Sequence, residues 1–260
     1  MRPLLFLLLL AWALAGEDSE VFSPYKPNYF LPFSYDTQSH PDRANQMEAN
    51  FQFSFKHRLA KGLFLNRGEL FLAYTQKSFW QVYHRENSRP MRTADHNPEI
   101  FATFPFHPLF TALGLVDWRV AYEHQSNGGG TEDSRSWDRA YAAVTGRHFY
   151  LKLWQRFPER AKRYPEDVGG DDNPGISDYY GNGELHLQAD IGNHQLTAMI
   201  RNNLNPSANK GAVELGWNAP IPGNAYFIVT LWSGYGESLI DYDRYLNKIG
   251  MGLLFTRFDP

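Results

Sequence analysis

Apolar and polar residues alternate along most of the chain beyond residue 28. Phe51, Phe53 and Phe55 fall on one parity, with Gln52 and Ser54 between them. Because successive side chains of a β-strand point to opposite faces, this alternation predicts strands. About twelve such segments are present. They are residues 28–36, 47–58, 63–83, 97–108, 112–126, 135–145, 148–157, 177–191, 194–203, 210–218, 225–237 and 247–258.

The lengths of these segments favour a membrane-spanning barrel over a soluble β-sandwich. Alternation alone fits both folds, because each presents one apolar parity. Most segments reach the roughly 9–11 residues that a tilted strand needs to cross a bilayer, whereas strands in globular proteins average about 5–6. Tight turns are predicted at residues 60–62, 107–112, 146–147, 192–193 and 219–223. They alternate with longer, polar loops. Bacterial outer-membrane barrels have this asymmetry, so we expect an all-β fold, a 12-stranded antiparallel transmembrane β-barrel.

The first fifteen residues have the pattern of a secretory signal peptide. A positive start precedes an apolar run from Leu4 to Leu10, and small residues follow at Ala13 and Ala15. The apolar run is too short for a transmembrane helix, which needs about 20 residues. We therefore expect a signal peptide over residues 1–15 and one outer-membrane barrel domain over residues 16–260.

Composition excludes several functional classes. The chain contains no cysteine, which excludes disulfides, thiolate metal sites and thiol catalysis. Its formal net charge is −3, from 25 basic and 28 acidic residues. A nucleic-acid-binding protein needs a basic stripe, which this balance does not indicate, so we expect no nucleic-acid partner.

One predicted hairpin brings together the residue types of a serine hydrolase. His124 and Ser126 are two residues apart, so in a strand they share one face. If the hairpin turns about Thr131, Asp138 lies opposite His124 on that face. A nucleophile, its base and a carboxylate that orients the base would then be adjacent. Taken alone, the pair His124 and Ser126 is weak evidence for catalysis and indicates a capped turn more often than an active site.

Parity also predicts where these residues face. The residues that share the parity of His124 and Ser126 along the strand are Val116, Trp118, Val120 and Tyr122. Because an apolar parity must meet lipid in a barrel, a nucleophile on this face implies a lipid substrate. Charged residues of the opposite parity should form a network in the lumen: Asp117, Arg119, Glu123, Arg139, Glu184, His186 and Asp190.

Three glycines follow Ser126 and Asn127 directly. Without side chains, Gly128, Gly129 and Gly130 let backbone N–H groups approach a ligand, as an oxyanion hole requires. A flexible loop is the other interpretation of the same glycines.

Five segments together resemble the outer membrane phospholipase A family. They are HQSNG from His124 to Gly128, SRSWDRAY from Ser134 to Tyr141, YTQKSFWQ from Tyr74 to Gln81, DDNP from Asp171 to Pro174, and SGYGESLIDY from Ser233 to Tyr242. The resemblance runs from about Tyr29 to the C-terminus. It implies a twelve-stranded outer-membrane barrel that hydrolyses acyl ester bonds of phospholipids, requires calcium and acts as a homodimer.

The resemblance also implies roles for individual residues. Ser126 would be the nucleophile, His124 the general base, and Gly128 the donor of an oxyanion N–H. Asp138 stands where the family typically has asparagine. Either side chain can accept the imidazole N–H, and an aspartate also stabilises the imidazolium.

Calcium ligands are implied in the same way. They are the carbonyl of Gly129, Ser134, Asp172, and Ser88 of the partner subunit. Calcium takes several oxygen ligands, often including backbone carbonyls. Thr131 stands where the family usually has an acidic residue, and Gln76 matches a polar residue that the family buries in its dimer interface.

We therefore expect a calcium-dependent phospholipase of the outer membrane, active as a homodimer, with its site loop on the extracellular side. Two alternatives stay open from the residues alone. One is a structural or pore-forming barrel whose site has decayed through Asp138 and Thr131. The other is a soluble secreted esterase with a sandwich fold.

Overall fold

The computed structural model describes residues 22–38, 45–86, 90–130, 133–165, 167 and 169–258. The predicted signal peptide, Ser88 and Thr131 lie outside the described residues. Within these ranges, no helix is both long enough and apolar enough to cross a membrane.

The described strands form one antiparallel sheet that closes on itself through the pairing of β3 with β4. The strands are β1 (Phe22–Pro24), β2 (Asn28–Asp36), β3 (Met47–Gly62), β4 (Gly68–Trp80), β5 (Met91–Pro105), β6 (Leu115–Ser126), β7 (Ser136–Gly146), β8 (Phe149–Arg156), β9 (Gly183–Ile191), β10 (His194–Asn202), β11 (Gly211–Ile221), β12 (Ala225–Tyr235) and β13 (Tyr245–Thr256). β1 and β2 pair one after the other with the same edge of β3, so they act as one interrupted strand. The predicted 12-stranded antiparallel β-barrel is thereby confirmed.

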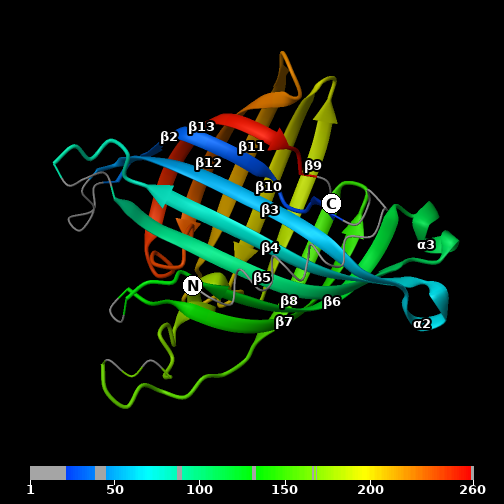
Figure 1. Ribbon diagram of the computed structural model, residues 1–260, viewed down its shortest axis with the longest axis horizontal. Helices are drawn as coiled ribbons and strands as arrows, with labels where there is room; N and C mark the ends of the chain where they lie inside the picture. The colour runs from blue at the N-terminus through cyan, green and yellow to red at the C-terminus, as the bar shows by residue number, and fades with distance from the viewer. Residues whose placement is uncertain are drawn as a thin grey trace.

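The connections differ between the two ends of the barrel. The short helices α2 (Leu63–Asn66) and α3 (Pro108–Ala112) lie together at one end, and longer connections extend from the other (Figure 1). Three predicted boundaries are wrong. Residues 60–62, predicted as a tight turn, are the end of β3, and the turn that follows contains α2. β5 begins at Met91, whereas the strand was predicted from residue 97. α4 (Ile176–Tyr180) occupies the start of the segment predicted as the strand 177–191.

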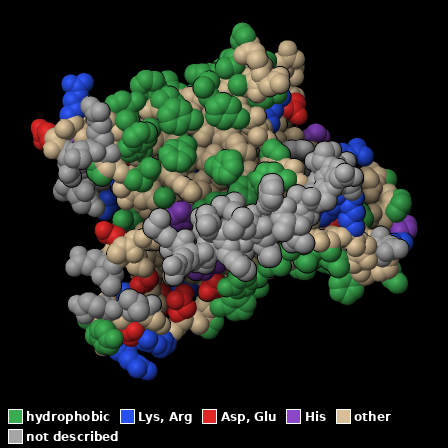
Figure 2. Space-filling view, viewed as in Figure 1, with side chains coloured by type: hydrophobic (Ala, Val, Ile, Leu, Met, Phe, Trp, Pro, Cys, Tyr) green, Lys and Arg blue, Asp and Glu red, His purple; other side chains and the backbone are tan. Residues whose placement is uncertain are grey.

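The outer wall is apolar between these two ends. Hydrophobic side chains cover the wall, whereas Lys, Arg, Asp and Glu gather at the ends (Figure 2). On β6, Trp118, Val120 and Tyr122 are 39%, 45% and 45% exposed, while Glu123 is 1% exposed. The predicted parity of β6 is therefore correct, and the side that carries His124 and Ser126 is the outer one.

Buried ion pairs join different parts of the wall across the lumen. In one cluster, Lys248 Nζ lies 2.7 Å from a carboxylate oxygen of Glu48 and 2.7 Å from one of Glu237. In the other, Glu123 Oε2 lies 3.0 Å from Arg139 and 2.7 Å from Lys152. Charges in a low-dielectric interior need such partners, so these contacts fix the inward side chains.

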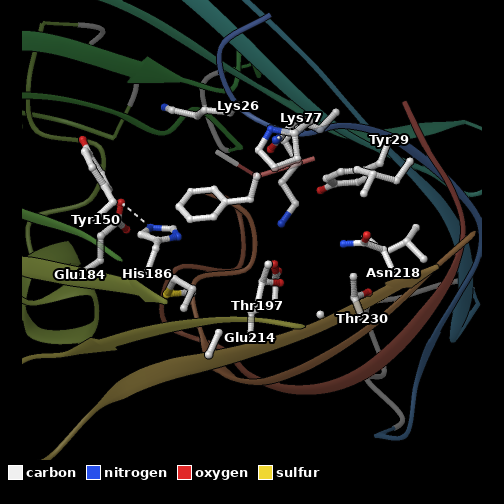
Figure 3. Close-up of a pocket in the computed structure, with 18 of the residues that line it drawn as sticks. Lys26, Tyr29, Lys77, Tyr150, Glu184, His186, Thr197, Glu214, Asn218 and Thr230 are labelled. Carbon is white, nitrogen blue, oxygen red and sulfur yellow. Dashed lines mark hydrogen bonds and ion pairs between the residues drawn. The ribbon is translucent and has the colours of Figure 1, made fainter. Parts of the chain in front are cut away.

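Other lumen residues line a cavity of about 380 Å³ (Figure 3). His186 Nε2 and Glu184 Oε1 meet there at 3.2 Å, and Arg119 pairs with Asp117 at 3.5 Å. These contacts agree with the predicted polar network. Asp190 is exposed near the end of β9 and makes no ion pair within the described residues, so its predicted place in the network is wrong.

Candidate active site

The β6–β7 hairpin has the register that the sequence predicts. His124 pairs with Asp138, and Ser126 pairs with Ser136. The side chain of Asn127 closes the loop: its Oδ1 accepts from the backbone N–H groups of Gly129 (3.2 Å) and Arg135 (2.9 Å). An Asn side chain that bonds neighbouring backbone in this way fixes a turn. The loop is thus held closely to the strands that carry the candidate residues.

His124 and Asp138 form a hydrogen-bonded pair on the outer wall. His124 Nδ1 lies 2.8 Å from Asp138 Oδ1, and the two side chains are 36% and 33% exposed. An aspartate accepts at this position, so Nδ1 carries the proton and Nε2 is left as the basic nitrogen. The hydroxyl of Tyr122 donates to the same Asp138 oxygen at 2.6 Å. Asp138 therefore has two donors that satisfy its charge near lipid.

Ser126 lies at the end of β6, on the same face as His124. The two side chains do not form a hydrogen bond: within the described residues Ser126 Oγ has no hydrogen-bond partner. Nucleophile–base contacts in ligand-free enzymes are often long and tighten only when substrate binds. The register brings all three predicted residues together, and the contact with Asp138 orients the imidazole of His124.

The glycine loop presents backbone next to Ser126. Gly128 has φ +60°, a left-handed conformation that favours glycine. A Cβ at Gly129 would come within 2.7 Å of the Asp133 carbonyl oxygen, so this position also requires glycine. In the described part of the chain, no hydrogen bond engages the Gly128 N–H. That donor is available for a ligand, as an oxyanion hole needs.

Two of the four predicted calcium ligands are in direct contact. Ser134 Oγ donates to Asp172 Oδ2 at 2.7 Å. The other oxygen of Asp172 pairs with Lys162 Nζ at 2.5 Å. Among the described residues, no group of three or more His, Asp or Glu side chains could hold a metal ion. The candidate set therefore depends on hydroxyl and carbonyl oxygens in addition to one carboxylate.

The loop that carries Asp172 is anchored to the barrel. Asn173 Oδ1 accepts from the Ser136 N–H at 3.1 Å, next to the start of β7. Ile176 of α4, which is fully buried, packs in an apolar cluster with Trp137 inside the barrel. These contacts hold the loop against the hairpin near Ser134, so that Asp172 lies in contact with Ser134.

Charged side chains of this loop also pair with charges at the end of β8. Asp171 Oδ1 accepts from Arg156 at 2.6 Å, and both side chains are 10% exposed. Burial, reinforced by the nearby Asp171 carboxylate, raises the pKa of the Glu159 carboxyl above its usual range. The rim above the site is therefore held by paired charges.

Sequence reasoning missed Tyr122, Asn127 and Lys162 as parts of the site. The alternation of the strand could have identified Tyr122, because it lies two residues before His124 on the same face. Asn127 was available from turn chemistry, since Asn at the start of a glycine loop often bonds backbone. No local signal in the sequence indicates that Lys162 pairs with Asp172.

The family model described as Phospholipase A1 matches residues 13–255. The chain belongs to the phospholipase A1 family. A putative phospholipase A1 of Neisseria meningitidis serogroup B is 34% identical, over 94% of this chain and 73% of that protein. Phospholipase A1 of Escherichia coli K12 is 32% identical, over 83% of this chain and 72% of that protein.

Solved structures of the phospholipase A1 family agree with the fold. Outer membrane phospholipase A from Escherichia coli has a TM-score of 0.80 at 28% identity, covering 93% of this chain and 94% of that structure. The Salmonella typhi outer membrane phospholipase dimer with bound calcium has a TM-score of 0.79 at 27% identity, covering 94% of this chain and 95% of that structure. This family membership and the closed barrel identify the chain as an outer-membrane phospholipase, as the sequence predicts.

Proposed function

We propose that the chain hydrolyses acyl ester bonds of membrane phospholipids at the outer wall of the barrel, with Ser126 as nucleophile. The observation that carries the proposal is the His124–Asp138 pair, 2.8 Å apart on the lipid-facing side and two residues from Ser126. Polar and charged side chains on a lipid-facing wall cost free energy, so a hydrogen-bonded pair there indicates a function.

The chemistry follows from these positions. Ser126 Oγ attacks the ester carbonyl carbon, its proton passes to His124 Nε2, and the carbonyl electron pair moves to oxygen. The Gly128 N–H stabilises that oxyanion. The intermediate collapses with loss of the alkoxide of the lysophospholipid, which takes the proton from His124. Water then repeats the sequence on the acyl-enzyme and releases a fatty acid. Asp138 orients His124 throughout.

Release of fatty acid from phospholipid in detergent micelles, with calcium or with a chelator, tests the proposal directly. Calcium-dependent release is expected from the purified full-length protein. A serine-reactive sulfonyl fluoride distinguishes the rival interpretation, an inactive structural or pore-forming barrel. Selective labelling of Ser126 is expected here, whereas a decayed site would not react.

Asp138→Asn should keep most of the activity, within about tenfold, because an amide oxygen still accepts from His124 Nδ1 and from the Tyr122 hydroxyl. Asp138→Leu removes the acceptor and should lower kcat on the order of 10⁴-fold, as removal of the orienting carboxylate does in a serine-hydrolase triad. Measurement of kcat for both variants in mixed micelles checks this. If Asp138→Leu were as active as the parent, Asp138 would not be part of the active site.

We also propose a calcium site on the loops above Ser126. The oxygen-only donor set fits a hard cation: the Ser134 hydroxyl already contacts the Asp172 carboxylate, and the Gly129 carbonyl belongs to the same loop. Ser88 of the partner subunit would complete the set and lies outside the described residues. When bound, calcium would supply positive charge for oxyanion stabilisation.

Lys162→Met should raise calcium affinity about tenfold, because the Lys162 ammonium is paired with Asp172 and must be displaced by the ion. Asp172→Asn should lower the affinity by a similar factor. Isothermal titration with calcium in detergent measures both without reference to activity. Arg160→Met is the matched control, since Arg160 pairs with Asp167 on the same loop. A loss of calcium affinity in Lys162→Met would contradict the proposal that the Lys162 ammonium and calcium compete for Asp172.

The homodimer and the orientation of the loops belong to the same proposal. Gln76 lies on the outer wall, opposite Phe53 of β3, which is 55% exposed. A polar side chain on this apolar face is better satisfied against a second barrel than against lipid. Chemical crosslinking with and without calcium tests dimerisation. Protease access in intact cells tests whether the hairpin loop at Gly128 faces outward.

A further inference from the structure

Two turns at the end of the barrel away from Ser126 expose large apolar side chains. In α2, between β3 and β4, Phe64 and Leu65 are 79% and 96% exposed. Between β5 and β6, Leu109 of α3 and Leu113 just after it are 68% and 76% exposed. Both turns project beyond the wall at the same end (Figure 1). Apolar groups gathered and exposed in this way mark an interaction surface.

The other connections at this end of the barrel are polar. They are residues 147–148 between β7 and β8, 192–193 between β9 and β10, and 222–224 between β11 and β12. None of them contains a large apolar residue. In α2, moreover, Phe64 and Leu65 have φ +45° and +63°, which bulky residues rarely adopt. A backbone conformation that costs free energy and presents apolar side chains outward indicates a function for these two turns.

The apolar surface of the turns continues the lipid-facing wall. The ring of Phe64 lies 5.7 Å from that of Phe104, which stacks on Trp118 with centroids 4.5 Å apart. Trp118 is on the outward parity of β6, whose 12 residues run from Leu115 to Ser126. At a tilt of about 40°, such a strand rises roughly 28 Å, close to the hydrocarbon thickness of about 30 Å. With Ser126 near one membrane interface, α3 therefore lies at the other.

Cations surround the apolar side chains of the two turns. Lys61 and Arg67 flank α2, and both are exposed. Arg147 reaches α3, where its Nη2 lies 3.4 Å from the carbonyl oxygen of Thr111. The segments 60–68, 107–115 and 146–148 contain one acidic residue fewer than any pairing would need, because none of them includes Asp or Glu. Hydrophobic and basic side chains lie next to each other at this end (Figure 2), a combination that binds anionic lipid surfaces.

We propose that α2 and α3 anchor the barrel in the leaflet opposite Ser126, with their apolar side chains among the acyl chains and Lys61, Arg67 and Arg147 at the phosphates of anionic phospholipids. Both turns belong to the β3–β6 side of the barrel, which also carries Ser126. The anchor would hold this side at a fixed depth, so that Ser126 stays at the level of the headgroups on the other surface. It is independent of the catalytic role of Ser126.

Site-specific labelling tests the position of the two turns. The chain has no cysteine, so one introduced cysteine carries a single bimane label. Leu65→Cys and Leu113→Cys place the label in the two turns, and Asn193→Cys places it in a polar turn at the same end as the matched control. In vesicles of phosphatidylcholine and phosphatidylglycerol, lipids brominated in the acyl chains should quench the labels at 65 and 113. Acrylamide should quench these two labels about fivefold less than the label at 193, because an anchored apolar surface lies about 5–10 Å below the headgroups.

Two arginine substitutions test the preference for anionic lipid. Brominated phosphatidylglycerol should quench the labels at 65 and 113 more than brominated phosphatidylcholine does. Arg67→Gln at the first turn and Arg147→Gln at the second should each lower this preference roughly threefold, because each removes a charge that attracts the anionic headgroup. Arg163→Gln is the control, since Arg163 is exposed in the long loop at the opposite end. All variants should keep the heat-modifiable gel mobility of a folded barrel.

Three results would overturn the anchor. Acrylamide quenching at 65 and 113 equal to that at 193 would place both turns in water. Protection from acrylamide without quenching by brominated lipid would assign the surface to a protein partner or a second copy of the chain. Equal quenching by the two brominated lipids, or a preference that survives both arginine substitutions, would exclude anionic phospholipid as the occupant.

Discussion

Ser126→Ala should abolish phospholipid hydrolysis, with a loss of kcat on the order of 10⁵-fold or more. The reason is that the alanine leaves no group to form the acyl-enzyme, while His124 and Asp138 stay paired at 2.8 Å. Residual activity would come only from binding and from the oxyanion donors. Fatty-acid release from phospholipid micelles in the presence of calcium measures the loss.

Ser136→Ala is the matched control, because Ser136 lies directly opposite Ser126 on β7 and its backbone N–H is already held by Asn173. It should keep the parent activity. Both variants should retain the heat-modifiable gel mobility of a folded barrel. Full activity of Ser126→Ala would rule out Ser126 as the nucleophile.

Lys248→Met should destabilise the barrel by about 3–5 kcal/mol, because it leaves buried carboxylates without their shared cation. The Lys248 side chain is 2% exposed and bridges Glu48 and Glu237, which are 2% and 6% exposed. Arg92 still pairs with Glu48 at 2.8 Å, so the main cost falls on Glu237. Guanidinium unfolding in detergent, followed by tryptophan fluorescence, measures the free energy of unfolding.

Two variants make this expectation specific. Adding Glu237→Gln to Lys248→Met removes the unpaired carboxylate and should recover part of the lost stability. Glu69→Gln breaks a pair with Arg58 at 3.6 Å in which the glutamate is 37% exposed, and it should cost about 1 kcal/mol or less. A Lys248→Met barrel as stable as the parent would mean that the lumen pairs are not structural.

Much of the fold and the positions of the candidate triad could be predicted because both depend on parity. Alternation places Ser126, His124 and Asp138 on one face whatever the details of the loop. The hairpin register then follows from a turn centred near residue 131, and the structure has that register. The two-residue period of a strand is a strong local signal, and the placement of these three residues depends on that period alone.

The rest of the site could not be predicted because it depends on contacts between distant strands and loops. His96 lies opposite Ser126 only because of the register of β5 on β6, and the connection between these strands contains α3. Lys162 reaches Asp172 through the fold of a long loop. Boundaries failed where backbone conformation departs from a strand, as at α4, whose Ile176 and Tyr180 are buried by packing on Trp137.

The two buried charge clusters in the lumen also differ in when they can assemble. Glu123 and Lys152 are 29 residues apart on neighbouring hairpins, so their cluster can form as soon as β6 to β8 associate. Glu48 and Lys248 are 200 residues apart, and β13 must pair with β2 before they meet. Local contacts form faster than distant ones. The wall that carries the candidate catalytic residues is therefore stabilised from within early in folding, and Lys248 joins the two ends of the sheet only when the last strand pairs.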